Sequence, residues 1–313
     1  MSGTQMRAIV DMLLTNVAKG YAPKNYISES ILPVIQSAQT TGKLGSYGTA
    51  HLRIVNTVRG GKGKFREVDS TSYSTSGYEI EGHGISDLVT KEDYKNVIEP
   101  FRAEEDKVMA LSNILWLEKE KGLADQLGNT AVLTQNTTLV GNAQYSDPLN
   151  SQPVQDFQVA RAAVYDGCGE VPNLAIMSWD VKNILKYHPQ LLDLLGYKFA
   201  RPGGLSDEEL ARALDVDKVL IGTAKYESAK EGQTSVLSSV WGKNIVFAVA
   251  PEKPQIMQVS LGYTVRYEGE SPRKAYKEAQ FDPPGSTKIL VEDNYDQLFT
   301  NVGAAYLIKN AVA

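Results

Sequence analysis

One long polar stretch near the N-terminus constrains this chain more than any other segment. Residues His51 to Thr90 favour strands, but most are polar or charged, and glycines stand at positions 60, 61, 63 and 77. A two-stranded ribbon with so little apolar surface is not stable alone, and a polar excursion of this length is uncommon in a compact domain unless it has a function. We therefore expect a neighbouring subunit to hold the ribbon, which indicates a protein built for assembly.

Composition and charge exclude several classes of protein. The 313 residues carry a net charge of -5, which argues against a general nucleic-acid binder because phosphate neutralisation needs a basic surface. Cys168 is the single cysteine, so an internal disulfide is impossible and a reducing compartment is expected. No apolar run approaches the ~20 residues of a membrane helix. The N-terminal residues lack the order of a signal peptide and predict a short amphipathic helix with Ile9, Leu13, Leu14 and Val17 on one side.

The segment from Phe101 to Leu127 has the strongest helical pattern. Acidic residues at 104–106 open it and Lys119 and Lys121 lie near its end, an order that suits the helix dipole. Its apolar residues form one slightly rotating stripe: Val108, Leu111, Leu115, Trp116, Leu123 and Leu127. At ~1.5 Å per residue the helix is a rod of roughly 40 Å. A shorter helix precedes it, opened by Thr90 and Asp93 in a capping-box spacing.

Beyond Val171 the pattern alternates between strands and helices, which predicts a compact α/β unit of roughly a hundred residues. Ser206 and Glu209 form a capping box there. The expected helices are Val154–Tyr165, Asp180–Leu185, Pro189–Leu195 and Asp207–Leu214. The expected strands are Leu174–Met177, Val219–Gly222, Asn244–Ala250, Ile256–Arg266, Thr287–Val291 and Ala304–Ile308, while residues 129–153 are predicted to form a loop.

No local motif points to catalysis. The sequence GGKGKF at 60–65 lacks the Walker spacing, because Phe65 follows Lys64 where Ser or Thr is required, so a basic hairpin tip is favoured over a phosphate site. His83 has only Glu79 and Glu81 nearby, which falls short of a zinc pattern. Cys168 has no local base or cation that would activate its thiol. We expect no catalytic residue, cofactor or metal.

Two groups of charged residues can be interpreted either as solvated surface charges or as functional residues. Glu104, Glu105 and Asp106 are expected to be a solvated helix start rather than acid–base catalysts. The ribbon's charges are either solvated or form ion pairs between subunits. The candidate contact residues are Lys62, Lys64, Arg66 and Glu67.

The order of these elements resembles the tailed-bacteriophage major capsid protein with the Hong Kong 97-type shell fold, an α+β fold. The segments that carry the resemblance are REVDSTSYSTSGYEIEGHGISDLVT, SWDVKNILKYHPQLLDLL, ELARALDVDKVLIGTAKY and VEDNYDQLFTNVGAAYLIKNAV. The resemblance implies an N-terminal arm (1–50), an extended E-loop hairpin (51–86), a peripheral domain with a long spine helix (87–165 and 266–298), and an axial α/β domain (166–265 and 299–313). The last strand would return to the axial domain.

The resemblance also implies partners. The subunit would assemble with itself into the hexamers and pentamers of an icosahedral shell around double-stranded DNA, which it would meet by non-specific proximity. The arm starts at Met1 and is too short for a fused scaffolding segment, so a separate scaffolding protein is expected, together with a portal protein and a possible decoration protein. No membrane is involved: the protein would lie in the virion capsid after assembly in the host bacterial cytoplasm.

Two other functions remain open at this point. An encapsulin-type nanocompartment shell protein has a similar architecture and encloses cargo enzymes, and genome neighbours would distinguish it from a phage capsid. An α/β enzyme with a site assembled from distant residues is the third possibility. It leaves the ribbon unexplained, and a turnover screen on the free subunit would test it.

Overall fold

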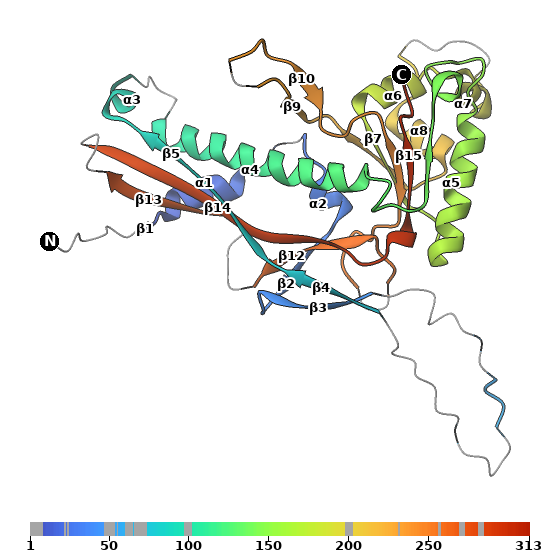
Figure 1. Ribbon diagram of the computed structural model, residues 1–313, viewed down its shortest axis with the longest axis horizontal. Helices are drawn as coiled ribbons and strands as arrows, with labels where there is room; N and C mark the ends of the chain where they lie inside the picture. Colours follow the sequence, from blue (N-terminus) through green and yellow to red (C-terminus); the bar gives the residue numbers. More distant parts are fainter. Residues whose placement is uncertain are drawn as a thin grey trace.

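The computed structural model describes residues 9–21, 23, 25–46, 54, 56–59, 65, 74–96, 102–197, 203–230, 232–255, 258–268, 273–280 and 285–313. These residues form two halves (Figure 1). The long half is a helix lying along an extended sheet, and the compact half is a second sheet with several short helices at one end of that helix.

The sheet of the long half is organised around its longest strand, β14 (Ser286–Phe299). Strand β14 pairs with three strands, all antiparallel. They are β5 (Glu81–Val89), β13 (Lys274–Gln280) and β12 (Gly262–Tyr267). The two-residue strand β1 (Ile9–Val10) adds to β13, and β2 (Val34–Ser37) lies parallel to β12.

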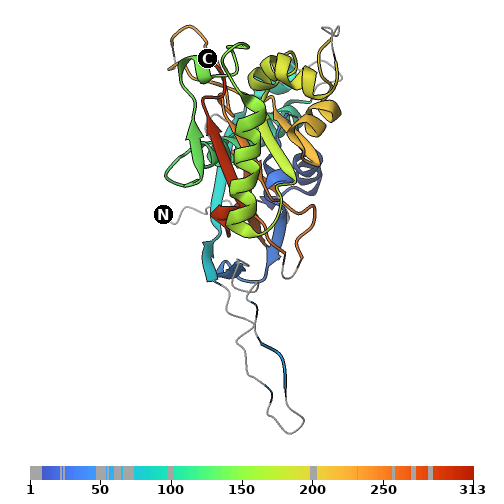
Figure 2. The same cartoon turned by 90° about the vertical axis from the view of Figure 1, so that its right-hand side faces the viewer.

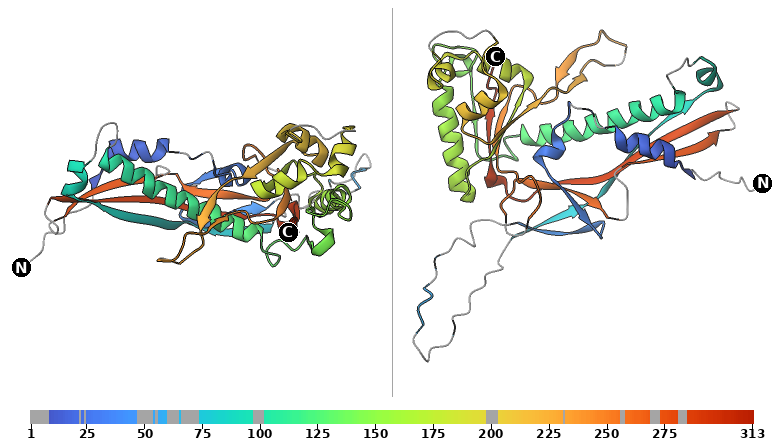
Figure 3. Two further views of the ribbon diagram at one scale, coloured as in Figure 1. Left: turned by 90° about the horizontal axis from the view of Figure 1, so that it is seen from above. Right: turned by 180° about the vertical axis from the view of Figure 1, so that it is seen from behind.

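One face of this sheet is covered by helices. The long helix α4 (Ala103–Leu127) and the N-terminal helix α1 (Met12–Gly20) pack on it, and Val108, Leu111 and Leu115 of α4 are buried against strand residues such as Ile289 and Val291. Side chains alternate along a strand, so Leu290 points to the opposite face. Figures 1 and 3 show no helix beneath that part of the sheet, which leaves its second face open.

The compact half contains a five-stranded sheet in the order β6-β15-β11-β7-β8. Its strands are β6 (Asn136–Thr138), β15 (Ala305–Lys309), β11 (Ile245–Ala248), β7 (Leu174–Ser178) and β8 (Lys218–Gly222). On one face lie α5 (Pro153–Cys168), α6 (Trp179–Leu185), α7 (Pro189–Leu194) and α8 (Asp207–Leu214) around one apolar cluster. Figure 2 views this half with α5 in front of the sheet.

The other face of the five-stranded sheet forms the junction between the halves. There the end of α4 and the short helix α2 (Ser28–Ile31) pack against it in a second apolar cluster. Leu123 and Leu127 of α4, Ile31 of α2 and Leu307 of β15 are all fully buried in this cluster. The two halves are therefore joined by an apolar contact as well as by the chain itself.

The remaining elements project from the halves. A two-stranded sheet of β3 (Thr41–Ser46) and β4 (Ser74–Glu79) lies below the long sheet, and a hairpin of β9 (Lys225–Glu227) and β10 (Leu237–Ser239) projects from the compact half (Figure 1). Helix α3 (Lys91–Asn96) precedes α4, and the 3-10 turns η2 (Gly141–Ala143) and η3 (Val302–Ala304) lie in the compact half.

Most elements expected in the second half of the chain are present. The Ser206–Glu209 capping box opens α8, and the Thr90–Asp93 pair caps α3, with the Asp93 backbone N–H donating to Thr90 and the Thr90 N–H donating to Asp93. The last strand, β15, returns to the five-stranded sheet, where it lies between β6 and β11. The expected strand over Ile256–Arg266 is wrong at its start, because residues 258–261 are irregular and β12 begins at Gly262.

Strand pairing places two segments differently from their sequence assignment. The E-loop hairpin was expected to end at Ser86, whereas Glu81–Val89 form β5 and pair with β14. Residues 262–265 were expected with the compact domain, but they pair with β14 in the long sheet. Both segments follow the register of the fourteen-residue strand β14, which was expected only over Thr287–Val291. Strands β1, β2, β3, β6, β13 and the β9–β10 hairpin were not expected. Ile9, expected in the N-terminal helix, lies in β1, because it pairs with Lys277 of β13 and α1 begins only at Met12.

Candidate assembly surfaces

The polar ribbon is anchored by the β3–β4 pair, and next to it the backbone N–H of Ile80 donates to the Thr40 carbonyl at 2.9 Å. The candidate contact residues Lys62, Lys64, Arg66 and Glu67 lie outside the described residues. Three of the nearby residues that the structure describes carry exposed apolar side chains. Ile54, Val58 and Phe65 are 102, 89 and 81% exposed. The Arg59 guanidinium lies 4.3 Å from the centre of the Phe65 ring. Apolar groups this exposed are typical of a contact made elsewhere.

The open face of the long sheet contains a groove of about 410 Å³. It lies across β5, β14 and β13, because Gly84 and Ser86 carry little side chain between bulkier neighbours. Leu290 and Tyr276 line it, and the Tyr276 hydroxyl donates to Glu292. The groove is therefore an apolar depression with one polar rim.

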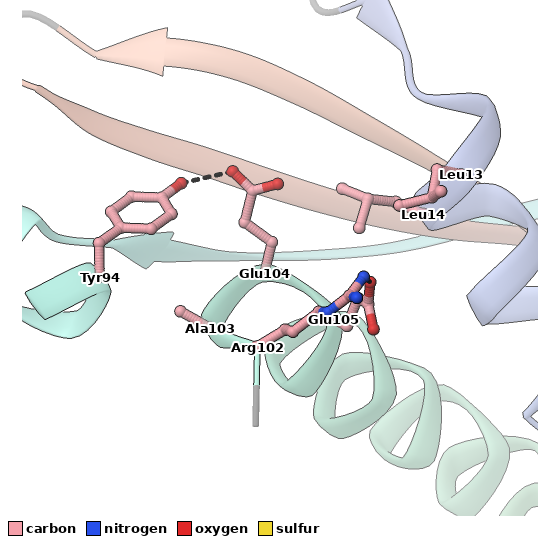
Figure 4. Close-up of a pocket in the computed structure, with 7 residues that line it drawn as sticks. All are labelled: Leu13, Leu14, Tyr94, Arg102, Ala103, Glu104 and Glu105. Carbon is pink, nitrogen blue, oxygen red and sulfur yellow. Dashed lines mark hydrogen bonds and ion pairs between the residues drawn. The ribbon is translucent and has the colours of Figure 1, made fainter. Parts of the chain in front are cut away.

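A second depression, of about 470 Å³, lies where α1, α3 and the start of α4 meet (Figure 4). The Tyr94 hydroxyl donates to Glu104 at 2.5 Å, and Arg102 pairs with Glu105 at 2.8 Å. The acidic start of α4 is thus engaged in local hydrogen bonds and ion pairs. Beside it the N-terminal segment exposes four apolar residues: Ile9, Val10, Met12 and Leu13.

The compact half carries a third apolar site. Trp179 at the start of α6 is 51% exposed and lines a depression of about 260 Å³ together with Lys225 and Ser239 of the β9–β10 hairpin. The same hairpin exposes Val236 and Leu237. Each of the three depressions therefore lies beside apolar side chains that the subunit itself does not cover.

Beneath α4 the long sheet and the N-terminal segment meet in a cluster of charged residues. Glu29 of α2 pairs with Lys119 of α4 at 2.8 Å and with Arg266 of β12 at 3.0 Å. Arg266 also pairs with Asp293 of β14 at 3.2 Å. The Lys119 and Asp293 side chains are 1 and 3% exposed. Lys119 was expected only to complement the helix dipole near the end of the helix, and its burial and its pairing with Glu29 were not expected.

Arg273 completes this cluster in an unusual conformation. Its backbone φ is 99°, a region that L-residues rarely adopt. Its guanidinium donates to the carbonyls of Ala18 and Tyr21 at the end of α1, pairs with Asp293 at 3.4 Å and lies 3.9 Å from the Trp116 ring centre. A cation at a helix C-terminus is stabilising, so these contacts offset the backbone strain.

The electrostatics of the cluster favour a charged Glu29. Burial pushes its pKa upward, but the nearby cations Lys119 and Arg266 outweigh burial and hold the pKa below its usual value. The carboxylate therefore remains ionised at neutral pH and holds α2 against α4.

The residues considered for chemistry show no catalytic arrangement in the described part of the chain. Cys168 is buried, which raises the pKa of its thiol. His188 is buried against the Ser151 hydroxyl at 3.0 Å, and burial lowers its pKa. His83 stacks on Tyr295, and its Nδ1 lies 3.7 Å from a Glu118 carboxylate oxygen. No group of three metal-binding side chains occurs among the described residues, and none of the described helices is long and apolar enough to cross a bilayer.

Comparison with solved structures defines the class of fold. No family model matches the chain. A phage-related protein from Bordetella bronchiseptica RB50 superposes with a TM-score of 0.75 at 24% identity, covering 97% of this chain and 98% of that one. The bacteriophage PhiM1 mature capsid superposes with a TM-score of 0.54 at 12% identity, covering 99% of this chain and 92% of its own. The fold is that of phage capsid proteins.

Curated relatives narrow the class further. The chain is 26% identical over 268 residues to the major capsid protein of Burkholderia phage BcepMu, covering 83% of this chain and 84% of that protein. It is 23% identical over 309 residues to the major capsid protein of Pseudomonas phage JBD67, covering 97% of each. The chain is thus a homologue of phage major capsid proteins. This confirms the resemblance seen in the sequence and favours it over an encapsulin-type shell protein.

Sequence reasoning missed the buried charged cluster. Its signal lies in strand parity: Asp293 is on the same face of β14 as the buried Ile289 and Val291, so its side chain must point into the interior. A carboxylate at an inward position predicts a buried cation partner.

Proposed function

We propose that this chain is the shell-forming subunit of a tailed phage, with the Hong Kong 97-type arrangement, and that it closes into hexamers and pentamers around double-stranded DNA. The compact half, which also contains β6 and α5, serves as the axial domain expected over 166–265 and 299–313. The long half, which also contains the whole of β12, serves as the peripheral domain expected over 87–165 and 266–298. The arm spans 1–50 and the E-loop 51–86, although β5 shares the peripheral sheet. The observation that supports this most is the homology to major capsid proteins over nearly the whole chain.

The uncovered surfaces support the same proposal. A long sheet with one bare face and several exposed apolar sites needs partners, and repeated heterologous contacts end when symmetry closes. The subunit has no enzymatic role in this proposal. It assembles in the host cytoplasm with a separate scaffolding protein and a portal, a decoration protein can join the outside, and packaged DNA meets the inside without specific contacts.

Co-expression with the scaffolding protein tests the proposal directly. Negative-stain microscopy should show closed icosahedral particles. A subunit that stays monomeric under these conditions and is absent from virus particles would contradict the proposal.

The ribbon charges provide a second test. Lys62→Glu with Lys64→Glu should leave the subunit folded but reduce shell formation, because a small loss of ~0.2–1 kcal/mol per ion pair recurs in every copy. The matched control is Lys243→Glu with Lys253→Glu, at exposed positions in loops of the compact half. Equal assembly of the ribbon variant and the wild type would show that the ribbon charges make no contact between subunits.

A further inference from the structure

The junction between the halves contains a fully buried carboxylate, Glu120 of α4. One of its oxygens accepts the indole N–H of Trp241 at 2.7 Å, from the compact half. The carboxylate also accepts the backbone N–H groups of Ile27 at 3.0 Å and Ser28 at 2.8 Å, from the start of α2. One side chain of the long helix therefore holds two other parts of the chain at once.

The position of Trp241 is fixed from the other side by the edge of the five-stranded sheet. Its ring lies against Gly222 at the end of β8, where an added Cβ would come within 1.9 Å of the ring carbon Cδ1 and 2.4 Å of Nε1. Trp241 is only 5% exposed, so the ring has no free space to retreat into. Contacts thus run without a break from β8 through Trp241 to Glu120.

The apolar part of the junction is less specific about the angle between the halves. Its apolar cluster, which includes Leu123, Leu127 and Leu307, holds the halves together, but apolar association is non-directional. A hydrogen bond depends on distance and angle, and a buried acceptor that loses its donor is penalised. The Trp241–Glu120 bond is therefore the contact that discriminates between orientations.

We propose that Glu120 is a positioning residue, which fixes the orientation of the compact half against the long helix through the indole of Trp241. This angle recurs in every subunit, so it also contributes to the curvature of the shell. The curvature step rests on the proposed function, whereas the orientation step is a property of the single subunit.

The orientation step is testable by spin labels on the free subunit. Ala110→Cys on α4 and Ala162→Cys on α5 are exposed positions in the two halves, and the buried Cys168 is spared from labelling. Trp241→Phe keeps a ring but removes the N–H donor. Gly222→Ala keeps both residues of the bond but displaces the ring. Glu118→Gln is the matched control. Glu118 lies two residues before Glu120 on the same helix, and its side chain is 59% exposed.

We expect both Trp241→Phe and Gly222→Ala to raise the population outside the wild-type label distance by about fivefold, the factor that one net hydrogen bond is worth, while circular dichroism and the control stay as in the wild type. An unchanged distance distribution in folded Trp241→Phe overturns the positioning role, since the donor is then dispensable. If one variant fails to fold, the other decides.

Particle size tests the curvature step separately. In co-expression with scaffold, the two variants should produce more particles of aberrant diameter than the wild type and Glu118→Gln. A displaced label population with particles of wild-type size overturns the curvature step alone. Failure of the wild type to form any particle overturns the proposed function and leaves the label result standing.

Discussion

The two sheets of this protein differ in how completely their own chain covers them. Every residue of β7 and β11 in the compact half is buried, because helices lie on one face and the end of α4 on the other. Burial along β14 in the long half alternates instead, and only the face toward α4 is covered. The compact half thus satisfies its own apolar surface. The long half leaves one face to other contacts, as expected where a subunit meets its neighbours.

The largest expected effect comes from removing one large side chain from each sheet. Phe247→Ala in β11 should lower the free energy of unfolding by about 3–5 kcal/mol, because Phe247 is fully buried and packs 5.6 Å from the Phe157 ring. Leu290→Ala on the open face should cost below ~1 kcal/mol, because partial exposure leaves less area to lose. Urea unfolding of both purified variants measures the difference.

Assembly should reverse this order for variants that fold. Leu290→Ala should reduce particle yield although its subunit is nearly as stable as the wild type, because the groove on the open face loses its apolar floor. Equal losses of stability in the two variants would show that the faces are covered alike. In that case the open face would not distinguish the halves.

The next effect concerns the charges beneath α4. Lys119→Met keeps most of the side-chain volume but removes the buried cation that pairs with Glu29. We expect a loss of ~2 kcal/mol, because the partly exposed Glu29 carboxylate loses the buried one of its two cations while Arg266 remains. Lys121→Met is the matched control: its i,i+4 pair with Asp125 is more exposed and should contribute below ~0.5 kcal/mol. Thermal and urea unfolding compare the two, and equal effects would argue against an energetic role for the burial of Lys119.

The difference between the halves also decides what the sequence could predict. The buried runs at 174–177 and 245–248 and the capping box at Ser206 are local signals, and such signals predicted most elements of the compact half, although not β6 or the β9–β10 hairpin. The strands of the long half depend on pairing between distant segments, such as β5 with β14, so their bounds follow from a register that no local pattern contains.

The same reason explains which candidate residues were missed. The stripe of α4 was predicted because its period is local, but Glu120 and Lys119 interrupt that stripe as charges. Their burial follows only from partners far away in the sequence, Trp241 and Glu29. The ribbon was predicted to contact neighbouring subunits because its polar composition is a local signal, and that contact stays a prediction.

A smaller effect should appear on acidification. The pKa of Glu29 is lowered in the folded state, so its charged form contributes stability above the unfolded value of about 4.3. That contribution is lost as the pH falls through the lower folded pKa. Partial exposure of the side chain, 35%, keeps the effect below that of Lys119→Met. Glu29→Gln should therefore be less stable than the wild type at pH 6, and the gap should close toward pH 3. A gap that stays constant with pH would contradict an ionised Glu29.

The smallest expected effect compares one capping motif in the two halves. Ser206→Ala removes the cap of α8, whose Leu210 and Leu214 are buried in the compact core, so it should cost about 1 kcal/mol. Thr90→Ala removes the equivalent cap of α3, a helix with no buried residue. Because α3 can fray without exposing core, its loss should change global unfolding by only a few tenths of a kcal/mol. Amide exchange should instead rise locally at 91–96 in Thr90→Ala. If both substitutions lowered the free energy of unfolding equally, α3 would unfold cooperatively with the core. The difference between the compact half and the long half would then not extend to α3.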